Sequence, residues 1–439
     1  MTPVPADLPR VLLLTSSAFN SLSGGGITLG NLFRGWPRER LAVAHNDPIP
    51  PDPEPCARYY ALGQDELGWQ WPLSLWQRRA PSGVVTADGA ASPRAATGAP
   101  RRWARGLLRA VTSDGGLHDH AAVTPALRAW IAELRPQVLY TFLGSLGFVR
   151  LARAIADETG AAIVVHMMDD WPRTLYRGGL LGPYLRATLD RELRGLLARA
   201  ATRMGIGADM CEEYRRRYGL EFLPFHNVLD ATAWRPHMRR DWAVRSPARL
   251  LYAGSILANA QRDSLLDIAR AVGELRTEGL EVELHLHTPF GRADANRPFF
   301  EGLPGVFLGD PPPGEAIAQE LAAADVLVLP VNFDGATIEY VRLSFPTKLP
   351  AYMLSGTPIL AYGPEEVAQI RLARDEGWGR VVSRRDRPLL KAAIRALCQP
   401  GDGRAQLGRR AQDVAQRDHD ASRVRAGFQQ AIASAPKVR

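Results

Sequence analysis

Short apolar runs alternate with stretches of helical periodicity along most of this chain. Runs such as those at 10–15 and 326–330 are rich in Val and Leu, as expected of strands that are buried on both faces. Each is followed by a segment in which apolar residues recur at the spacing of one helix face. This alternation predicts an α/β fold built on doubly wound parallel sheets. The expected strands lie at 10–15, 137–142, 162–166, 202–207, 249–253, 282–287, 306–308, 326–330 and 358–362, and the expected helices at 126–134, 148–158, 185–200, 208–218, 263–278, 315–324, 388–397 and 404–433.

The length of 439 residues is too great for one ordinary core and suits two domains. A connector at 236–246 is rich in arginine and has little apolar periodicity, so we expect a linker there. The predicted domains are therefore 1–235 and 247–405, followed by a C-terminal helix at 406–439. Within the first domain, residues 46–125 are predicted to be an irregular insertion because they include proline-rich and small-residue stretches.

Composition and charge exclude several classes of protein. The three cysteines, Cys56, Cys211 and Cys398, are too scattered for a disulfide framework or a CxxC metal site, which favours a cytoplasmic location. The apolar run at 11–14 is too short for a signal segment or a membrane span. A net charge of +8 suits phosphorylated ligands, nucleic acid or an anionic membrane. No aromatic-basic interleaving or zinc pattern supports nucleic acid.

A basic segment at 101–111 has the spacing of a short helix, with Trp103, Leu107 and Val111 on one side. One interpretation is a peripheral contact with a membrane surface. The other is a helix that packs on its own domain.

Three consecutive glycines, Gly24, Gly25 and Gly26, lie between the first strand and the first helix. Without Cβ atoms, a backbone can bring its N–H groups close to a ligand, and ligands of open α/β sheets bind at this carboxyl edge. The glycines therefore predict a phosphate-binding turn. The alternative is a flexible turn without a ligand.

Polar residues also follow the strand at 162–166. His166, Asp169 and Asp170 are candidates for contacts to a substrate or for acid–base groups, because site residues gather at the carboxyl ends of parallel strands. Alternatively, His166 is a hydrogen-bonded core residue and one aspartate caps the next helix.

The segment 344–364 combines a polar turn, a predicted helix of about three turns, a glycine stop at Gly356 and a buried strand. Ser344, Thr347 and Lys348 would meet at the helix N-terminus, where backbone N–H groups and a positive dipole favour a phosphate or diphosphate. An ordinary capped helix with a solvated lysine is the alternative. The segment 344–364 is a late strand–helix repeat of a second sheet, and this position favours the phosphate site.

In their order and spacing, these landmarks resemble the GT-B glycosyltransferases, and among them the retaining group called glycosyltransferase family 4. The resemblance covers nearly the whole chain except 46–125. The segments that carry it are the glycines at 24–26, FHNVLD at 225–230, LYAGS at 251–255, ADVLVLP at 324–330, SFPTK at 344–348 and SGTPI at 355–359.

This resemblance implies two Rossmann-like domains that face each other across a cleft. A nucleotide-sugar donor would be bound mainly by the C-terminal domain and a glycan or lipid-linked acceptor by the N-terminal one. The implied activity is sugar transfer in cell-surface polysaccharide or glycoconjugate synthesis, in the cytoplasm or at the inner face of the membrane. The implied site residues are His166, Asp169 and Asp170 for catalysis, Gly24, Gly25, Gly26, Arg262, Ser344, Thr347 and Lys348 for the donor phosphates, and Ser255, Gly309 and Glu339 for its sugar and nucleoside.

No Asp-x-Asp motif is placed to hold a metal-bound diphosphate, since Asp169 and Asp170 are adjacent. The prediction is therefore a retaining transfer without a metal ion or a further cofactor. Lys348, the dipole of its helix, Arg262 and the glycine amides would stabilise the charge that develops on the diphosphate.

The chain also departs from the family pattern. The paired glutamates of the family fall at Leu343 and Ala351, an arginine is replaced by Ser255, and Glu339 is a candidate substitute. A non-catalytic GT-B binding or scaffold subunit therefore stands as the alternative function. An epimerase built on the same fold is a lesser enzymatic alternative.

Overall fold

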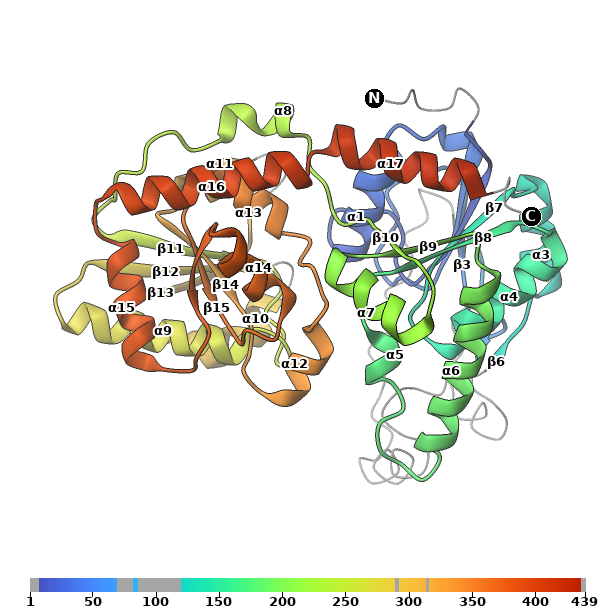
Figure 1. Ribbon diagram of the computed structural model, residues 1–439, viewed down its shortest axis with the longest axis horizontal. Coiled ribbons are helices and arrows are strands. Elements are labelled where there is room, and N and C mark those ends of the chain that lie inside the picture. Colours follow the sequence, from blue (N-terminus) through green and yellow to red (C-terminus); the bar gives the residue numbers. More distant parts are fainter. Residues whose placement is uncertain (1–7, 69–81, 86–119, 289–291, 313–315, 436–439) are drawn as a thin grey trace. The chain divides into compact units, whose positions relative to one another are not determined.

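The computed structural model of the chain divides into two compact units, shown in Figure 1. The first unit comprises residues 1–227 and 425–439, and the second comprises 228–424. The residues described by the structure are 8–68, 82–85, 120–288, 292–312 and 316–435. The basic segment expected at 101–111 lies outside them.

The sheet of the first unit has the strand order β10-β9-β8-β7-β1-β2-β3-β5. Its neighbouring strands are parallel except for the edge strand β5, which is antiparallel to β3. The central strands are buried throughout, as their apolar sequences predict. The strands are β1 (Val11–Thr15), β2 (Leu41–His45), β3 (Tyr59–Ala61), β5 (Gly83–Val85), β7 (Val138–Phe142), β8 (Ala162–Met167), β9 (Thr202–Gly205) and β10 (Leu223–Pro224).

The prediction of an irregular insertion at 46–125 was wrong for part of the residues that the structure describes. There, β3 and β5 extend the main sheet, while β4 (Leu67–Gly68) and β6 (His120–Ala121) form a separate pair. Strands of two or three residues are too short for the alternation of polar and apolar side chains to be recognised.

The helices of the first unit begin at residues suited to that position. Thr124 and Ser145 accept hydrogen bonds from the first turns of α3 and α4, and Gly160 ends α4 in a left-handed conformation. On α17, Phe428 packs edge-on against Phe33, with ring centroids 5.1 Å apart. The helices are α1 (Gly24–Phe33), α3 (Pro125–Leu134), α4 (Leu146–Thr159), α5 (Trp171–Thr174), α6 (Gly182–Arg199), α7 (Ala208–Tyr218) and α17 (Ala421–Ser434).

The second unit contains a fully parallel sheet with the order β13-β12-β11-β14-β15-β16. Successive residues of β11 point into different cores. Leu250 and Tyr252 pack with α9 (Arg262–Thr277) and α15 (Arg387–Leu397). Leu251 packs with α13 (Leu349–Ser355) and α16 (Asp402–Asp418). The sheet is therefore doubly wound, as predicted. Its strands are β11 (Ala248–Ala253), β12 (Val282–His287), β13 (Val306–Gly309), β14 (Val326–Pro330), β15 (Ile359–Tyr362) and β16 (Gly379–Val382).

The helices of the second unit include several that the sequence did not predict, among them α12 and α14. None of the helices in the described ranges is both long enough and apolar enough to cross a bilayer. The helices are α8 (Ala231–Trp234), α9 (Arg262–Thr277), α10 (Arg292–Phe300), α11 (Ala316–Ala323), α12 (Gly335–Val341), α13 (Leu349–Ser355), α14 (Ala368–Glu376), α15 (Arg387–Leu397) and α16 (Asp402–Asp418).

The C-terminal helix expected at 406–439 is two helices, α16 and α17, separated at His419 and Asp420. From Arg425 onward the chain belongs to the first unit. The first unit also ends at Asn227 and not at residue 235, and the expected linker at 236–246 belongs to the second unit.

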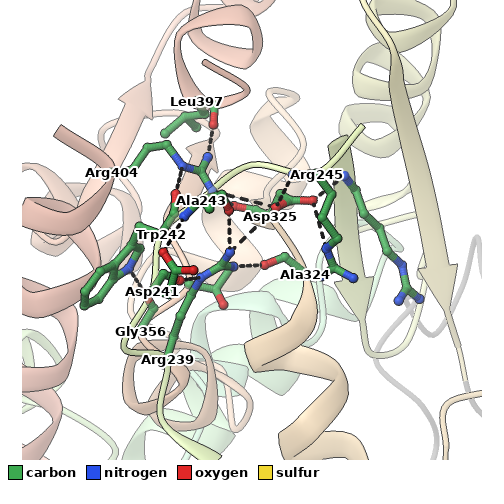
Figure 2. A network of polar contacts seen from close by, with 12 residues as sticks. Arg239, Asp241, Trp242, Ala243, Arg245, Ala324, Asp325, Gly356, Leu397 and Arg404 are labelled. Atoms are coloured by element: carbon green, nitrogen blue, oxygen red, sulfur yellow. Dashed lines mark hydrogen bonds and ion pairs between the residues drawn. The ribbon is translucent and has the colours of Figure 1, made fainter. Parts of the chain in front are cut away.

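A buried carboxylate explains why the connector belongs to the second unit. The Asp325 carboxylate accepts hydrogen bonds from the backbone N–H groups of Arg245 (3.3 Å) and Arg249 (2.9 Å). The guanidinium groups of Arg239 and Arg245 lie 3.6 and 3.7 Å from it, and that of Arg404 lies 4.0 Å away. Figure 2 shows these side chains converging on Asp325. Arginines that resemble a solvated linker in the sequence therefore surround a buried anion.

Trp242 fixes the middle of the same connector. Its Nε1–H donates to the Gly356 carbonyl (2.8 Å), at the end of α13. Next to it, Gly408 of α16 has no room for a side chain, because an added Cβ would collide with the indole and with the Gly356 carbonyl. The connector is thus packed between α13 and α16.

We predict that Asp325→Ala lowers the free energy of unfolding by about 3–5 kcal/mol, because it leaves buried arginines without their anion. Urea denaturation measures this change. The control is Asp375→Ala, which removes an exposed carboxylate paired with Arg374 and should cost less than about 1 kcal/mol. Equal effects of the two substitutions would contradict a central role for Asp325.

Candidate functional site

The glycines of the first unit form the opening turn of α1. The Ser23 hydroxyl caps this turn by accepting from the Gly26 N–H (3.0 Å). An added Cβ on Gly25 would lie 2.6 Å from the Ser17 hydroxyl, and one on Gly26 would lie 2.7 Å from the Ala18 carbonyl. Glycine is therefore required at both positions for α1 to pack against the loop that precedes it.

Asn20 and Asp47 organise this loop, and the sequence analysis missed both. The Asn20 side chain accepts from the N–H groups of Leu22 (3.0 Å) and Ser23 (2.7 Å) and donates to Asp47 (3.1 Å). The same Asp47 oxygen accepts from the Ala18 N–H (3.1 Å). An asparagine before a glycine-rich turn is a local signal for such bonds. These hydrogen bonds therefore hold the loop before the glycines in its conformation.

His166 is a core residue of the first unit. Its side chain is fully buried, with Nε2 2.9 Å from the Phe225 carbonyl and Nδ1 2.7 Å from the Tyr140 hydroxyl. A carbonyl only accepts, so Nε2 carries the proton and Tyr140 donates to Nδ1. Burial lowers the pKa of His166 to about 4, although the bond to Phe225 opposes this shift. Both nitrogens are occupied by protein groups, which is the alternative the sequence analysis left open.

Asp170 is also buried and occupied. Arg217 donates to its two oxygens (2.7 and 2.9 Å), and Tyr214 donates to one of them (3.0 Å). Its side chain makes no capping bond to α5. Asp169 differs from its neighbour, since it is only partly buried. Of the three expected catalytic residues, Asp169 alone is accessible.

In the second unit, Lys348 lies at the carboxyl edge of the sheet. Its ammonium is 3.6 Å from the centre of the Tyr252 ring and 5.6 Å from that of Tyr352. The residue keeps some accessible surface, but burial lowers the pKa of its ammonium to about 7, and no acidic side chain of the described residues opposes that shift. A cation held on aromatic faces without a carboxylate is a ready partner for an anion.

The residues around Lys348 are fixed by hydrogen bonds. The Tyr352 hydroxyl accepts from the Ala253 N–H (2.7 Å) and donates to its carbonyl (3.2 Å), and Tyr252 donates to the Ser255 carbonyl (2.6 Å). Gly254 has φ of +148°, and an added Cβ would lie 3.2 Å from the Lys348 ammonium. Only glycine suits both the conformation and the space. Sequence analysis included this glycine and Tyr252 in a motif but missed their contacts.

The helix after Lys348 is shorter than predicted. α13 has seven residues and not three turns, with Lys348 as its N-cap, Pro350 in its first turn and Gly356 in the expected left-handed position. Ser344 and Thr347 are partly buried in the turn before it. The lysine and its tyrosines, rather than a long helix dipole, therefore distinguish this position.

The other expected donor-binding residues of the second unit are distributed over strand ends and helices. Ser255 follows β11, and Gly309 ends β13, next to His287 in register. Glu339 lies in α12. Arg262 begins α9, where its guanidinium stacks on Phe299 at 4.3 Å. In the described part of the chain, no three His, Cys, Asp or Glu side chains are arranged to hold a metal ion.

The N-terminus of α9 is already capped by a residue that the sequence analysis missed. The buried Asn332 accepts from the N–H groups of Asp263 (3.0 Å) and Ser264 (3.1 Å) and donates to the Ala258 carbonyl (2.9 Å). These amides are therefore used within the protein. A ligand near α9 would depend on the Arg262 side chain.

Comparison with solved structures identifies the architecture. The sequence matches no protein-family model and no curated protein. The structure is similar to Anabaena Alr3699/HepE in complex with UDP, with a TM-score of 0.57 and 14% identity over 97% of this chain and 100% of that one. The chain has the GT-B fold. Sucrose-phosphate synthase from Thermosynechococcus elongatus gives a TM-score of 0.59, with 14% identity over 96% and 98%. WaaG, a glycosyltransferase involved in lipopolysaccharide biosynthesis, gives 0.54, with 12% identity over 96% and 98%.

The GT-B fold was thus predicted correctly from sequence. Lys348 lies with Tyr252, Tyr352 and Gly254 at the carboxyl edge of the sheet in the second unit. Open α/β sheets bind ligands at this edge. The glycine turn occupies the corresponding edge of the first sheet.

We predict that the pKa of Lys348 can be observed directly, because the chain contains only three lysines. Reductive methylation with a ¹³C label, followed by NMR titration, should show one lysine with a pKa near 7, whereas the pKa of Lys391 is raised above its usual value by hydrogen bonds to Glu278 and Glu274. Lys348→Met should remove the shifted resonance. Three lysines that all titrate above pH 9 would contradict the buried arrangement.

We also predict that the first unit loses stability in acid because of His166. In the unfolded chain this residue takes up a proton near pH 6.5, whereas in the folded protein its pKa is about 4. The unfolded state therefore binds more protons between these values, and the free energy of unfolding falls by up to about 3 kcal/mol as the pH drops from 6.5 to 4.

Urea denaturation at several pH values measures this slope. His166→Gln should flatten it, whereas His120→Gln, at an exposed position, should not. An unchanged slope in His166→Gln would mean that other groups cause the acid sensitivity.

Proposed function

We propose that this protein is a glycosyltransferase that uses a nucleotide-sugar donor and binds the donor diphosphate through Lys348. The observation that carries the proposal is the Lys348 ammonium, which is held on two tyrosine rings without an acidic partner in the described residues. Structural neighbours support the ligand class, since Anabaena HepE has been crystallised with UDP and with UDP-glucose.

The chemistry of transfer favours a cation near the diphosphate. Breaking a sugar–phosphate bond leaves negative charge on the diphosphate, and a fixed positive charge in a poorly hydrated site stabilises that charge. A bound diphosphate favours the protonated form of Lys348 and raises its pKa. The lysine would then move from the Tyr252 ring to a phosphate oxygen.

We assign the rest of the donor to neighbouring residues of the second unit. Arg262, Ser344 and Thr347 are assigned to the phosphates, and Ser255, Gly309 and Glu339 to the sugar and nucleoside. In the first unit we assign the turn at 24–26 to the donor phosphates. Asp169 is the preferred contact to the reacting sugar, because it keeps accessible surface, whereas the side chains of His166 and Asp170 are buried.

In finer detail, we propose a retaining, metal-independent transfer of the family 4 kind to a glycan or lipid-linked acceptor. The first unit would bind this acceptor. The product would be a cell-surface polysaccharide or glycoconjugate made in the cytoplasm or at the inner face of the membrane. A peripheral membrane contact fits this role.

A second candidate function is binding without transfer. Leu343 is buried, and Ala351 packs against the core of the second unit. Neither side chain has an atom that can accept a hydrogen bond from a sugar or ribose hydroxyl. These are the positions at which the related family has paired glutamates. A protein of this kind would bind a nucleotide sugar without turning it over.

We predict that Lys348→Met weakens donor binding by about 10- to 100-fold, the expected loss of one charge-assisted phosphate contact. Calorimetric titration against UDP-, GDP-, ADP- and dTDP-sugars identifies the donor and measures the change. The matched control is Lys391→Met, which removes a lysine paired with Glu274 and Glu278 and should leave binding unchanged.

The pH dependence provides a second measurement. A sugar diphosphate keeps its charge across neutral pH, whereas Lys348 loses its proton above about pH 7. Affinity should therefore fall as the pH rises from 7 to 9, and this fall should vanish in Lys348→Met. Absence of binding to every donor would refute the proposal, and tight binding without transfer or hydrolysis would favour the second candidate.

A further inference from the structure

The connection between α5 and α6 and the first turn of α6 together expose three large apolar side chains in the first unit. Leu180 is 82% exposed, Tyr184 67% and Leu181 46%. Single exposed apolar residues are ordinary, but three within five positions form a patch that water solvates poorly. Figure 1 shows this connection at the end of α6 that lies farther from the sheet. We call residues 173–191 the α5–α6 tip.

Positive charge surrounds these apolar side chains. The tip contains four arginines and one acidic residue, Asp190. Arg177 lies close to two of the other arginines: its pKa is lowered by burial and then by the charges of Arg173 and Arg186. A surface with this excess of positive charge attracts anions. The arginines of the tip are Arg173, Arg177, Arg186 and Arg191.

A small cavity opens among these arginines. Its volume is about 270 Å³, and its wall includes Arg173, Arg186 and Arg217, together with Asp190 and Tyr218. Asp190 accepts from Arg194 at 2.7 Å, Arg217 is paired with Asp170 and Glu213, and the Arg173 guanidinium lies 4.0 Å from Glu213. The cavity is large enough for a phosphate group, and its wall contains more arginines than acidic residues.

We propose that the α5–α6 tip docks this protein on an anionic lipid surface. Leu180, Leu181 and Tyr184 enter the interfacial region, and the arginines bind phosphate headgroups. Apolar side chains that project from a basic surface are the combination that an anionic bilayer interface attracts, because burial of apolar area and electrostatic attraction then act together. An acidic protein partner would explain the arginines but not the three exposed apolar side chains at their centre.

Co-sedimentation of the full chain with vesicles tests the proposal. Wild-type protein should bind vesicles of 40% phosphatidylglycerol and 60% phosphatidylcholine and should bind pure phosphatidylcholine weakly. High salt should reduce binding to the anionic vesicles, because part of the attraction is electrostatic. Failure to bind anionic vesicles, or equal binding to both compositions, would overturn the proposal.

Two pairs of variants separate the tip from other surfaces. Leu180→Ser with Tyr184→Ser, and separately Arg177→Gln with Arg186→Gln, should each reduce binding at least about tenfold. The controls are Leu389→Ser, at a leucine that is 49% exposed in the second unit, and Arg374→Gln, at an exposed arginine. Equal binding by tip and control variants would also overturn the proposal.

A spectroscopic measurement keeps the test independent of sedimentation. Leu180→Trp should show blue-shifted fluorescence when anionic vesicles are added, as its side chain leaves water. Sedimentation equilibrium without lipid tests the other occupants. Self-association, or binding to polyglutamate, that depends on the tip while vesicles are not bound would identify a second copy or an acidic partner and refute the lipid proposal.

Discussion

The buried Asp325 carboxylate is the interaction on which the geometry of the second unit depends. It precedes β14 and accepts from the backbone just before and within β11, so it sets these two neighbouring strands relative to each other at their amino ends. At the carboxyl edge of the same sheet, the Tyr352 hydroxyl fixes the backbone of Ala253. The position of Gly254 beneath Lys348 follows from both constraints. A polar network at one edge thus supports the candidate site at the other.

The choice of lysine at position 348 has a physical reason. Nearly all the basic residues of the chain are arginine, and only three are lysine. A guanidinium remains charged at any pH, so an arginine enclosed by Tyr252 and Tyr352 would carry its full desolvation cost in the empty protein. An ammonium can give up its proton there, as the lowered pKa of Lys348 indicates. The site can therefore be stable without a ligand and cationic with one.

Elements that are long and strongly apolar were predicted from the sequence, as was the GT-B fold that they form. For β12, the first and last residues were both predicted correctly. It failed where tertiary contacts decide. From the sequence, the connector at 236–246 resembles a solvated linker. Only the structure shows that Asp325, about eighty residues later, lies against its arginines. Similarly, Lys348 was selected as a candidate site residue from its local spacing. Its contact with Tyr252, which lies on the distant strand β11, cannot be predicted from any local pattern. For His166 the sequence left two interpretations open, because hydrogen bonds to Tyr140 and Phe225 cannot be deduced from residue spacing.

Under the proposed function, the second unit would treat the two halves of a donor differently. Recognition of a diphosphate needs a cation, which Lys348 would supply. Recognition of sugar hydroxyls needs acceptors, and Leu343 and Ala351 offer none from their side chains. A polar site that matches a hydroxyl discriminates strongly against a ligand without it, whereas an apolar surface discriminates only weakly. Because affinity would then come chiefly from the diphosphate, any selectivity for the sugar has to come from backbone groups and from other side chains such as Glu339.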